Sequence, residues 1–449
     1  MTFTWSLSSY SSVFGELKKY QKDFSSRCGE CQREKKERQQ KGTLKIAKTM
    51  EQKGKMVASS SVPREILWSS LPKGVMCEIL KQFPVKTLLK LRCVSKVWCS
   101  IIDDPDFIRL HHNHSHTRPD GVSILLMIKC NDMNYGSDSG DYYKLYSQDP
   151  EGGPIVHLLK VPSVFVRSYG NYYDFQPDHE DTLQSVNGLV CIQNRIWNPS
   201  TRQRIHIPTR KTQVEGEDYP RREFRFYSRY FLGFDPFSDQ YKILHRHLII
   251  SAHSAHGGGV EERVEYQILT IGTNVWREID YVPHVQMVPN QRSCCIAGVI
   301  YSFARISDGS VVILAFELRH EEFRIIPLPQ QEYYADYTIL DLVQLGERLG
   351  LIIMNGDYGE VTRISTLEDY EKTVWKTENI MLPDYLKYSI PISGSIHTGE
   401  ILLGHESPFY YNLESRRFRR VDGFSNLPCN YDFCFYTKHV ESLFQLKKV

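Results

Sequence analysis

The chain has few side chains whose types and spacing could form a chemical site. Cys28 and Cys31 make a single C-x-x-C pair, whereas structural zinc usually takes four ligands, and no second pair follows at a suitable spacing. Four histidines lie within six residues: His111, His112, His114 and His116. No carboxylate or cysteine partner accompanies them at a fixed spacing, so we interpret them as part of a solvated linker. We therefore expect no metal and no cofactor.

The motifs of common catalytic sites are absent from the sequence. It contains no G-x-x-x-x-G-K-[ST] loop, no H-E-x-x-H and no G-x-S-x-G elbow. The glycine run 257–259 is not followed by Lys-Ser or Lys-Thr, so we interpret it as a hairpin tip. Cys294 and Cys295 begin an apolar strand, where buried structural thiols are expected. His245 and His247 alternate in a strand and share one face, and we expect them to face solvent or to be hydrogen-bonded.

Length and composition narrow the class of protein. The 449 residues suggest two to three domains, and a content of 41% hydrophobic residues is typical of a globular chain. A formal net charge of +2 excludes a general polyanion binder. No apolar run approaches the length of a membrane span, and the N-terminus lacks the features of a secretory signal. Eleven scattered cysteines suit a reducing compartment, so we expect a cytoplasmic or nuclear protein.

Residues 1–62 form a compositional block of their own. The first 60 residues hold 13 Lys and Arg against 6 Asp and Glu. A charge-rich segment with few apolar residues cannot compensate the entropy of ordering, so we expect it to be disordered. A basic tail of this kind could bind nucleic acid or direct nuclear import, but a solubilising tail is the interpretation that we favour.

The densest apolar pattern lies between Leu71 and Phe107, and it predicts three short helices. Pro72 suits a helix start, and Pro84 ends the first helix because it cannot donate to the preceding turn. A second helix follows Pro84, and a third carries Val94 and Trp98 before Asp103. So short a segment cannot bury all of its large side chains. We expect the remaining apolar surface to bind a partner.

This segment resembles an F-box. The matching residues are Leu71-Pro72, Glu78-Ile79-Leu80, Pro84, Lys86, Leu88-Leu89, Arg92, Val94-Ser95-Lys96, Trp98, Ile102, Pro105 and Phe107. The resemblance implies docking on a Skp-type adaptor, which bridges to a cullin. The adaptor-binding residues that it implies are Leu71, Pro72, Ile79, Leu80, Pro84, Leu88, Leu89, Val94 and Trp98. Some of these side chains, Trp98 above all, are also expected in the small core of the module itself.

From Gly121 onward the pattern changes to short alternating strands, and a strand–turn–strand unit recurs. The leading aromatic residues of successive units are Trp276, Phe323, Trp375 and Phe418, which lie 47, 52 and 43 residues apart. A period of about 40 to 50 residues with several strands per unit is typical of a β-propeller. We therefore predict a kelch-like propeller of six or seven blades, with stacked antiparallel sandwiches as the alternative.

The β region also resembles the plant F-box-associated domain, in the variant called type 3. The motifs that carry this resemblance are Val186–Cys191, Trp197–Arg202, Phe231–Pro236, Asp239–Leu244, Ile268–Thr273 with Trp276-Arg277, Ile296–Tyr301 and Phe316–Leu318 with Phe323. We predict an α+β multidomain chain, in which a three-helix F-box module precedes an all-β domain. The predicted parts are a basic extension at 1–62, the F-box module at 65–112, a linker at 113–120 and the β domain at 121–449.

The two resemblances together imply a substrate receptor of an SCF (Skp-cullin-F-box) ubiquitin ligase, with no catalysis of its own. Its β domain would capture a target protein for ubiquitination. Three alternatives stay open at this point. One is an adaptor-bound protein with a binding role outside degradation. Another is a propeller enzyme or carbohydrate-binding domain, which needs converging carboxylates or a metal in the channel. The last is nucleic-acid binding through the basic tail, with a steep dependence on salt.

Overall fold

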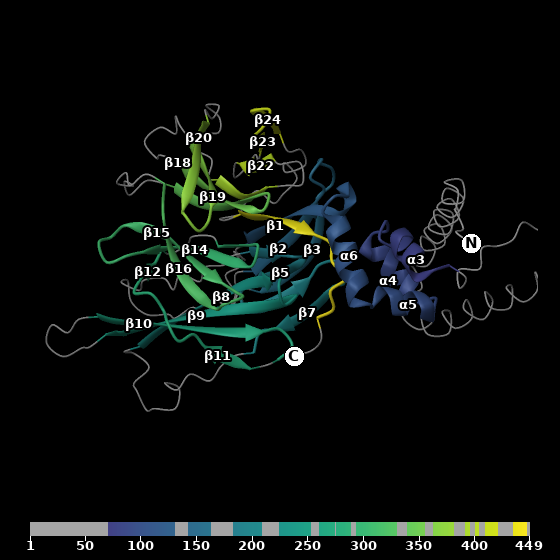
Figure 1. The fold of residues 1–449 in the computed structure, drawn as a ribbon, viewed down its shortest axis with the longest axis horizontal. Helices are drawn as coiled ribbons and strands as arrows, with labels where there is room; N and C mark the ends of the chain where they lie inside the picture. The colour runs from purple at the N-terminus through teal and green to yellow at the C-terminus, as the bar shows by residue number, and fades with distance from the viewer. Residues whose placement is uncertain are drawn as a thin grey trace, which may run out of the picture. The chain divides into compact units, whose positions relative to one another are not determined.

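The computed structural model describes most of the chain after residue 70. The described residues are 71–130, 142–162, 183–208, 224–252, 260–273, 275–288, 293–329, 339–354, 362–380, 391–395, 400–403, 409–420 and 434–446. The chain forms two compact units, residues 1–114 and 115–449, each of which is described by itself (Figure 1). The predicted basic extension, the C-x-x-C pair and the glycine run 257–259 lie outside the described residues.

The first unit is helical, and its helices begin where the sequence places helix-start residues. The described helices are α3 (Lys73–Leu80), α4 (Val85–Arg92), α5 (Lys96–Ile102) and α6 (Pro105–Ser115). Pro72 and Pro84 directly precede α3 and α4. Ser95 caps α5, because its Oγ accepts a hydrogen bond from the Trp98 amide at 3.4 Å. The three predicted helices are thus confirmed.

The fourth helix extends into the stretch that was predicted as a linker. Pro105 opens α6 at the first helical position, where its missing N–H has no helical partner. The helix continues to Ser115 and a 3-10 turn follows at Pro119–Gly121, so regular structure occupies much of 113–120. The expectation of a solvated histidine run is wrong for His111, which is fully buried with its Nε2 2.9 Å from the Phe83 carbonyl oxygen. One face of this helix points inward, and the interpretation of the stretch as a linker did not predict this burial.

The second unit is a β-propeller of six blades, each built around four antiparallel strands. From the innermost strand outward, blade 1 consists of β25 (Cys434–Val440), β1 (Val122–Cys130), β2 (Tyr142–Gln148) and β3 (Val156–Pro162). Blade 2 consists of β4 (Leu183–Val186), β5 (Leu189–Ile192), β6 (Arg195–Asn198) and β7 (Gln203–His206). Blade 3 consists of β8 (Phe224–Asp235), β9 (Gln240–Ala252), β10 (Val260–Thr270) and β11 (Trp276–Glu278). In blade 4, β13 (Cys294–Ile296) and β12 (Gln286–Met287) both pair with β14 (Val299–Arg305), which is followed outward by β15 (Val311–Glu317) and β16 (Glu322–Pro327). Blade 5 consists of β17 (Ile339–Leu345), β18 (Arg348–Met354), β19 (Thr362–Asp369) and β20 (Val374–Ile380). Blade 6 consists of β21 (Pro391–Ser395), β22 (Glu400–Leu403), β23 (Phe409–Asn412) and β24 (Arg417–Arg420).

The ring is closed by the two ends of this unit. The last strand, β25, pairs with the first, β1, from Val122 opposite Val440 to Ile128 opposite Cys434. Figure 1 shows this C-terminal strand, in yellow, beside β1. The innermost strands of neighbouring blades contact one another around the ring. The predicted propeller is confirmed with six blades, and the sandwich alternative is wrong.

The core lies between the blades, because successive residues of a strand point to opposite faces. Phe231 of β8 packs with Ile300 and Leu314 of blade 4. The next residue, Leu232, packs with Leu189 of blade 2. The four aromatic residues that predicted the period all lie on outermost strands, β11, β16, β20 and β24. No helix among the described residues is long and apolar enough to cross a membrane.

Antiparallel strands place the connections of each blade alternately on two faces of the ring. One face, here called the short-turn face, carries the links between the first and second and between the third and fourth strands, which are two to seven residues long. The other, here called the long-loop face, carries the remaining links, and the longest of these joins β3 to β4 through residues 163–182. The chain enters β1 on the short-turn face.

The tight turns of the short-turn face repeat one design. In three blades the amide that ends the turn donates to the carbonyl four residues earlier: Arg202 to Asn198, Glu321 to Glu317, and Arg416 to Asn412, at 2.8, 2.7 and 2.9 Å. Each donor residue has a positive φ, between 55° and 62°. Such single-turn units with a left-handed last residue reverse the chain in the fewest residues.

Candidate functional site

The structure separates the nine predicted adaptor-binding residues by exposure. Ile79, Leu80 and Leu88 are buried, at 4% exposure or less; Leu71, Pro84, Leu89 and Trp98 are half-buried; Pro72 and Val94 are exposed. The buried three belong to the core of the module, together with residues such as Phe83 and Ile102. Only the other six have surface that a partner could contact in the folded module.

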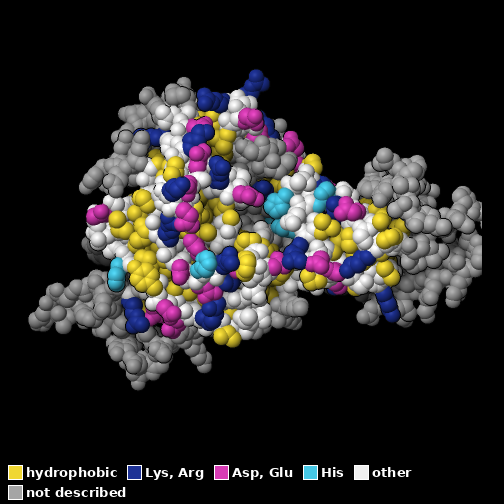
Figure 2. Space-filling model, in the orientation of Figure 1, with side chains coloured by type: hydrophobic (Ala, Val, Ile, Leu, Met, Phe, Trp, Pro, Cys, Tyr) yellow, Lys and Arg dark blue, Asp and Glu magenta, His cyan; other side chains and the backbone are white. Residues whose placement is uncertain are grey.

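Two valines supply the largest exposed apolar side chains of the module. Val94 is 52% exposed and Val97 is 47% exposed, three residues apart at the α4–α5 corner. Figure 2 shows hydrophobic side chains at the surface of this module with Lys and Arg side chains among them. The sequence analysis missed Val97, because Val97 precedes Ile101 by one helical turn and so appears to share its buried face. Its position in the first turn of α5 leaves it open.

The surroundings of this valine pair are basic. Residues 81–96 hold five Lys and Arg and no Asp or Glu. Lys86, Lys90 and Lys96 are exposed. Arg92 forms an ion pair, with Nε 2.8 Å from Asp103 Oδ1, and this pair ties the end of α4 to the end of α5. The module therefore presents an apolar patch with a positive rim, which favours a partner with an apolar groove and acidic edges.

In the propeller, the motif Trp197–Arg202 does more than turn the chain. Asn198 is fully buried, and its Nδ2 donates to the carbonyls of Ser442 and Phe444 at 3.1 and 2.8 Å. Its Oδ1 accepts from the amide of Ser200 at 2.9 Å, as an Asx turn does. The same side chain thus shapes its own turn and anchors the C-terminal segment after β25. Sequence reasoning found the turn but had no signal for the anchoring.

Gly188 serves the same closure from the neighbouring turn. Its φ is +82°, and a Cβ placed there would lie 2.2 Å from the Ser442 Cβ and 2.9 Å from the Val440 carbonyl oxygen. Only glycine allows both this backbone geometry and this approach. Tyr241 adds a further contact, because its hydroxyl donates to the Asn187 carbonyl at 2.6 Å and its ring packs on Phe444.

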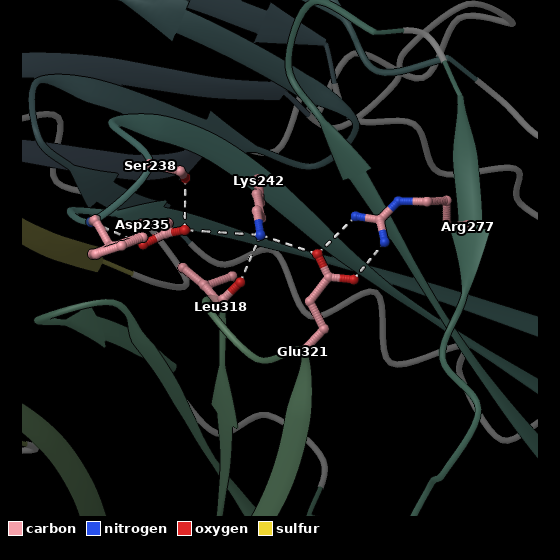
Figure 3. A network of polar contacts seen from close by, with 7 residues as sticks. Asp235, Ser238, Lys242, Arg277, Leu318 and Glu321 are labelled. Atoms are coloured by element: carbon pink, nitrogen blue, oxygen red, sulfur yellow. Dashed lines mark hydrogen bonds and ion pairs between the residues drawn. The ribbon is translucent and has the colours of Figure 1, made fainter.

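A buried lysine joins blades 3 and 4 on the short-turn face, as Figure 3 shows. Lys242 Nζ donates to the Leu318 carbonyl at 2.6 Å and to Glu321 Oε1 at 3.0 Å, and it lies 3.9 Å from Asp235 Oδ2. Arg277 binds both carboxylate oxygens of Glu321, at 2.6 and 2.7 Å. All of these residues except Glu321 belong to motifs that the sequence analysis quoted. Their arrangement is that of a structural joint.

The carboxylates of this joint stay ionised. Burial acts to raise the pKa of Glu321, but hydrogen bonds from Arg277 and Lys242 outweigh it and hold that pKa below its ordinary value. Burial likewise acts to raise the pKa of Asp235, and hydrogen bonds led by that of the Ser238 hydroxyl lower it overall. Because both folded-state pKa values are lowered, this stability is present above the ordinary values and is lost as the pH falls through the lowered ones.

The two other groups that the sequence analysis singled out are the histidines of β9 and the half-buried cysteines of β13. His245 and His247 are 8% and 7% exposed, which contradicts the first of the two predicted alternatives, that they face solvent. His245 stacks on Tyr230 at 4.5 Å between ring centroids. Burial raises the pKa of the Cys295 thiol to about 11 and that of Cys294 well above its usual range. Thiols held in this form are poor nucleophiles. Among the described residues, no three His, Cys, Asp or Glu side chains are placed to hold a metal ion.

Comparisons with known proteins agree with both parts of this architecture. Residues 68–110 match the model of the F-box domain, and residues 165–438 match that of the F-box associated beta propeller domain. A relative from Arabidopsis thaliana, named "Putative F-box protein At1g46984", is 27% identical, over 79% of this chain and 86% of its own length. The F-box protein DOR of the same organism is 26% identical, over 85% and 95% of the two chains.

Solved structures give a weaker likeness. TolB from Acinetobacter baumannii is 10% identical, covers 77% of this chain and 73% of its own, and has a TM-score of 0.35, which supports no argument. The family matches are different in kind, since they span the module and most of the propeller. F-box domains generally bind Skp-type adaptors, and proteins of this architecture are generally non-catalytic. With its F-box domain and a propeller match that covers more than half of its length, the chain belongs to the family of F-box proteins with an F-box associated β-propeller domain.

Proposed function

We propose that this protein is the substrate-recognition subunit of an SCF-type ubiquitin ligase. The observation that carries the proposal is the combination in one chain of an F-box module with an exposed apolar patch and a closed propeller. The module docks on a Skp-type adaptor, the adaptor bridges to a cullin, and the propeller captures a target protein. The chain works where these partners are found, in the cytoplasm or the nucleus.

In this proposal the chain makes and breaks no bonds. It holds a target close to a charged ubiquitin-conjugating enzyme, so that ubiquitin transfer becomes effectively intramolecular. The half-buried thiols and the structural joint around Lys242 fit a protein whose polar groups stabilise the fold. The propeller supplies a rigid frame for recognition, as scaffolds with variable connecting loops commonly do.

We assign the docking surface to Val94 and Val97, together with the half-buried Trp98, which follows Val97, and Leu89, which lies on α4. Burying one such side chain at an interface contributes about 1.5–3 kcal/mol. An Asp at either valine would remain solvated in the free module but would place a charge in the docked interface. Leu88 and Leu80, by contrast, are buried, so an Asp there tests folding instead of docking.

The test is co-purification of the full chain with a Skp-type adaptor. The Val94→Asp/Val97→Asp double variant should lose docking by at least 100-fold while its circular dichroism and melting temperature match wild type. The matched control is Val374→Asp, which changes a valine of similar exposure (45%) on β20 of the propeller and should leave docking unchanged. Docking that survives the double variant would exclude this surface, and failure of wild type to dock would contradict the proposed function.

A ubiquitination assay separates this function from a binding role outside degradation. The purified complex with cullin and conjugating enzyme should ubiquitinate a protein captured by the propeller, and the double variant should not support this transfer. Capture of a target without any ubiquitin transfer in the reconstituted complex would favour the role outside degradation.

A further inference from the structure

The most exposed large apolar side chain among the described residues is that of Phe237, at 72%. It lies in the short turn that joins β8 to β9 on the short-turn face. Among the described residues, its ring belongs to none of the apolar clusters that hold neighbouring blades together. The core of the propeller therefore does not require an aromatic side chain at this position.

The turn that carries Phe237 is held in place by its neighbours. Asp235 Oδ1 accepts a hydrogen bond from the Phe237 amide at 3.0 Å, and Asp235 Oδ2 accepts one from the Ser238 hydroxyl at 2.6 Å. Pro236 packs so closely on the neighbouring blade that a Cβ at Gly298 would lie 2.9 Å from the Pro236 Cδ. Because the turn is already ordered, little conformational entropy is lost when a partner binds to it.

An arginine of blade 4 lies over the Phe237 ring. The guanidinium carbon of Arg319 is 3.7 Å from the ring centroid. Arg319 belongs to the turn between β15 and β16, which the joint around Lys242 connects to the turn of Phe237 (Figure 3). A guanidinium that stacks on a ring uses its flat face, whereas its N–H donors lie in its plane. Stacking on Phe237 therefore leaves these donors available to a ligand.

Among the described residues, no carboxylate pairs with Arg319. The residue is exposed, and its contact with the Phe237 ring is the interaction that its side chain makes there. Glu321 of the same turn is already bound by Lys242 and Arg277. The surface thus presents an open cation beside an open aromatic ring. Aromatic and arginine side chains are both enriched in the cores of protein interfaces.

The charges near this pair favour a single carboxylate over a polyanion. Asp239 and Glu322 are exposed in and beside the same two turns, and their charges would repel a chain of phosphates. One carboxylate can instead bind two N–H donors along one edge of the guanidinium. An apolar side chain next to that carboxylate would cover the Phe237 ring and remove it from water. A protein segment offers both groups where an Asp or Glu adjoins an apolar residue.

We propose that Phe237 and Arg319 form a docking site for a protein segment in which an acidic residue adjoins an apolar one. The acidic side chain binds the edge of the Arg319 guanidinium, and the apolar side chain packs on the Phe237 ring. The site lies on the face whose side chains hold the ring closed, so it suits a partner that stays the same while the long loops vary. It goes beyond the proposed function and is independent of adaptor docking.

Peptides selected on the full chain are the probes that test this site. A phage-displayed library of random peptides is panned on wild type, with the Phe237→Ser/Arg319→Gln double variant as counter-selection. The selected peptides should carry an Asp or Glu next to a large apolar residue, and synthetic copies should bind wild type with a Kd below about 100 μM in fluorescence anisotropy. Replacing the acidic residue of the peptide by its amide should weaken binding at least tenfold.

Single variants of the protein assign the binding to the pair. Phe237→Ser and Arg319→Gln should each weaken binding at least tenfold, whereas Phe237→Tyr keeps the ring and should keep the binding. The matched controls are Tyr281→Ser and Arg305→Gln, which change an exposed tyrosine and an exposed arginine elsewhere in the propeller and should leave binding unchanged. All of these variants should melt like wild type and dock on the adaptor like wild type, because the changed side chains are exposed.

A double-variant cycle shows whether the two side chains act together. If the ring holds the guanidinium in place, the double variant should lose little more affinity than the weaker single variant, whereas independent contacts would give losses that multiply. Losses that multiply would overturn the proposal, as would a selection that yields no peptide or peptides without the acidic and apolar pair. Sedimentation velocity covers another occupant: a dimer of the full chain that Phe237→Ser abolishes would assign this surface to a second copy instead.

Discussion

The two faces of the propeller are built in different ways. On the short-turn face, buried side chains bind backbone atoms of other segments: Asn198 and Gly188 meet the C-terminal segment, and Lys242 joins blades 3 and 4. On the long-loop face, the chain passes between strands through connections of up to 20 residues, such as 163–182. The cost of closing a longer loop grows only slowly with its length.

Because of this difference, the contacts that stabilise the ring lie on one face, and the connections that can vary in sequence and length lie on the other. The short-turn face holds the ring closed, because contacts there connect the first blades to the end of the chain. The long-loop face can change in length at little cost in free energy. A receptor that must recognise a particular target benefits from this division, since changes in recognition need not disturb closure. The four predictions below test the division, beginning with the largest expected effect.

Removing the buried lysine should have the largest effect. We expect Lys242→Met to lower the free energy of unfolding by about 3–5 kcal/mol, because Asp235 stays buried without a cation nearby. Arg277→Met is the matched control, since it removes the exposed partner of the same Glu321 and should cost about 0–1 kcal/mol. Urea denaturation of both variants measures the difference. Equal losses in the free energy of unfolding would show that burial of the lysine is not what stabilises this joint.

A methyl group at Gly188 should break the closure. We expect Gly188→Ala to cost about 3 kcal/mol, from the left-handed backbone and from the clash with Ser442 together. Gly309 on the long-loop face has nearly the same φ, +85°, but a Cβ there would meet nothing within 4 Å. Gly309→Ala should therefore cost only about 1 kcal/mol of backbone strain. Thermal melts of the two variants measure both losses of stability. Equal losses for Gly188→Ala and Gly309→Ala would contradict this prediction.

Asn198 and Asn412 separate anchoring from turn formation. Both side chains accept an amide hydrogen bond in the same kind of turn, but only Asn198 also binds the C-terminal segment. We expect Asn198→Ala to cost about 2–3 kcal/mol and Asn412→Ala about 1 kcal/mol, in line with the two kinds of bond lost. Hydrogen exchange should report faster exchange of the amides of residues 441–446 in the first variant alone.

The smallest effect is expected on the outer strands, away from both faces. Trp375 donates its indole N–H to the Pro327 carbonyl at 3.1 Å, and Trp276 donates to Pro208 at the same distance. Trp375→Phe keeps an aromatic ring but loses the bond, at a cost of about 1 kcal/mol. Guanidinium titration can resolve this loss, and a loss as large as that of Gly188→Ala would show that the outer strands also hold the ring.

Much of the fold was predictable because its signals are local. Apolar residues at helical spacing after each of two prolines predicted α3 and α4, and the aromatic period predicted a propeller. The prediction of six or seven blades was not resolved further, because blade number depends on how strands close the ring. Helix α6 was missed, because four histidines in a polar stretch suggested solvent, and a buried hydrogen bond from His111 to Phe83 is not visible in their spacing.

The candidate docking surface was only partly predictable. The motif selected nine residues without distinguishing those that form the core from those that stay exposed. Leu88 and Leu89 are neighbours in sequence, yet Leu88 is fully buried and Leu89 is not. Val97 escaped notice since its exposure comes from the corner between α4 and α5. Exposure depends on which helices pack on which face, and the sequence of a single helix does not determine that packing.

The sequence alone determined the module, the strand repeat and the turns, because helix stripes, turn residues and strand alternation act over a few residues. Only the tertiary structure decided which parts meet. Asn198 binds a carbonyl 244 residues away, and Lys242 binds a carbonyl 76 residues away in the neighbouring blade. Such long-range contacts follow from closure of the ring. Closure buries together groups whose positions in the chain bear no fixed relation to one another.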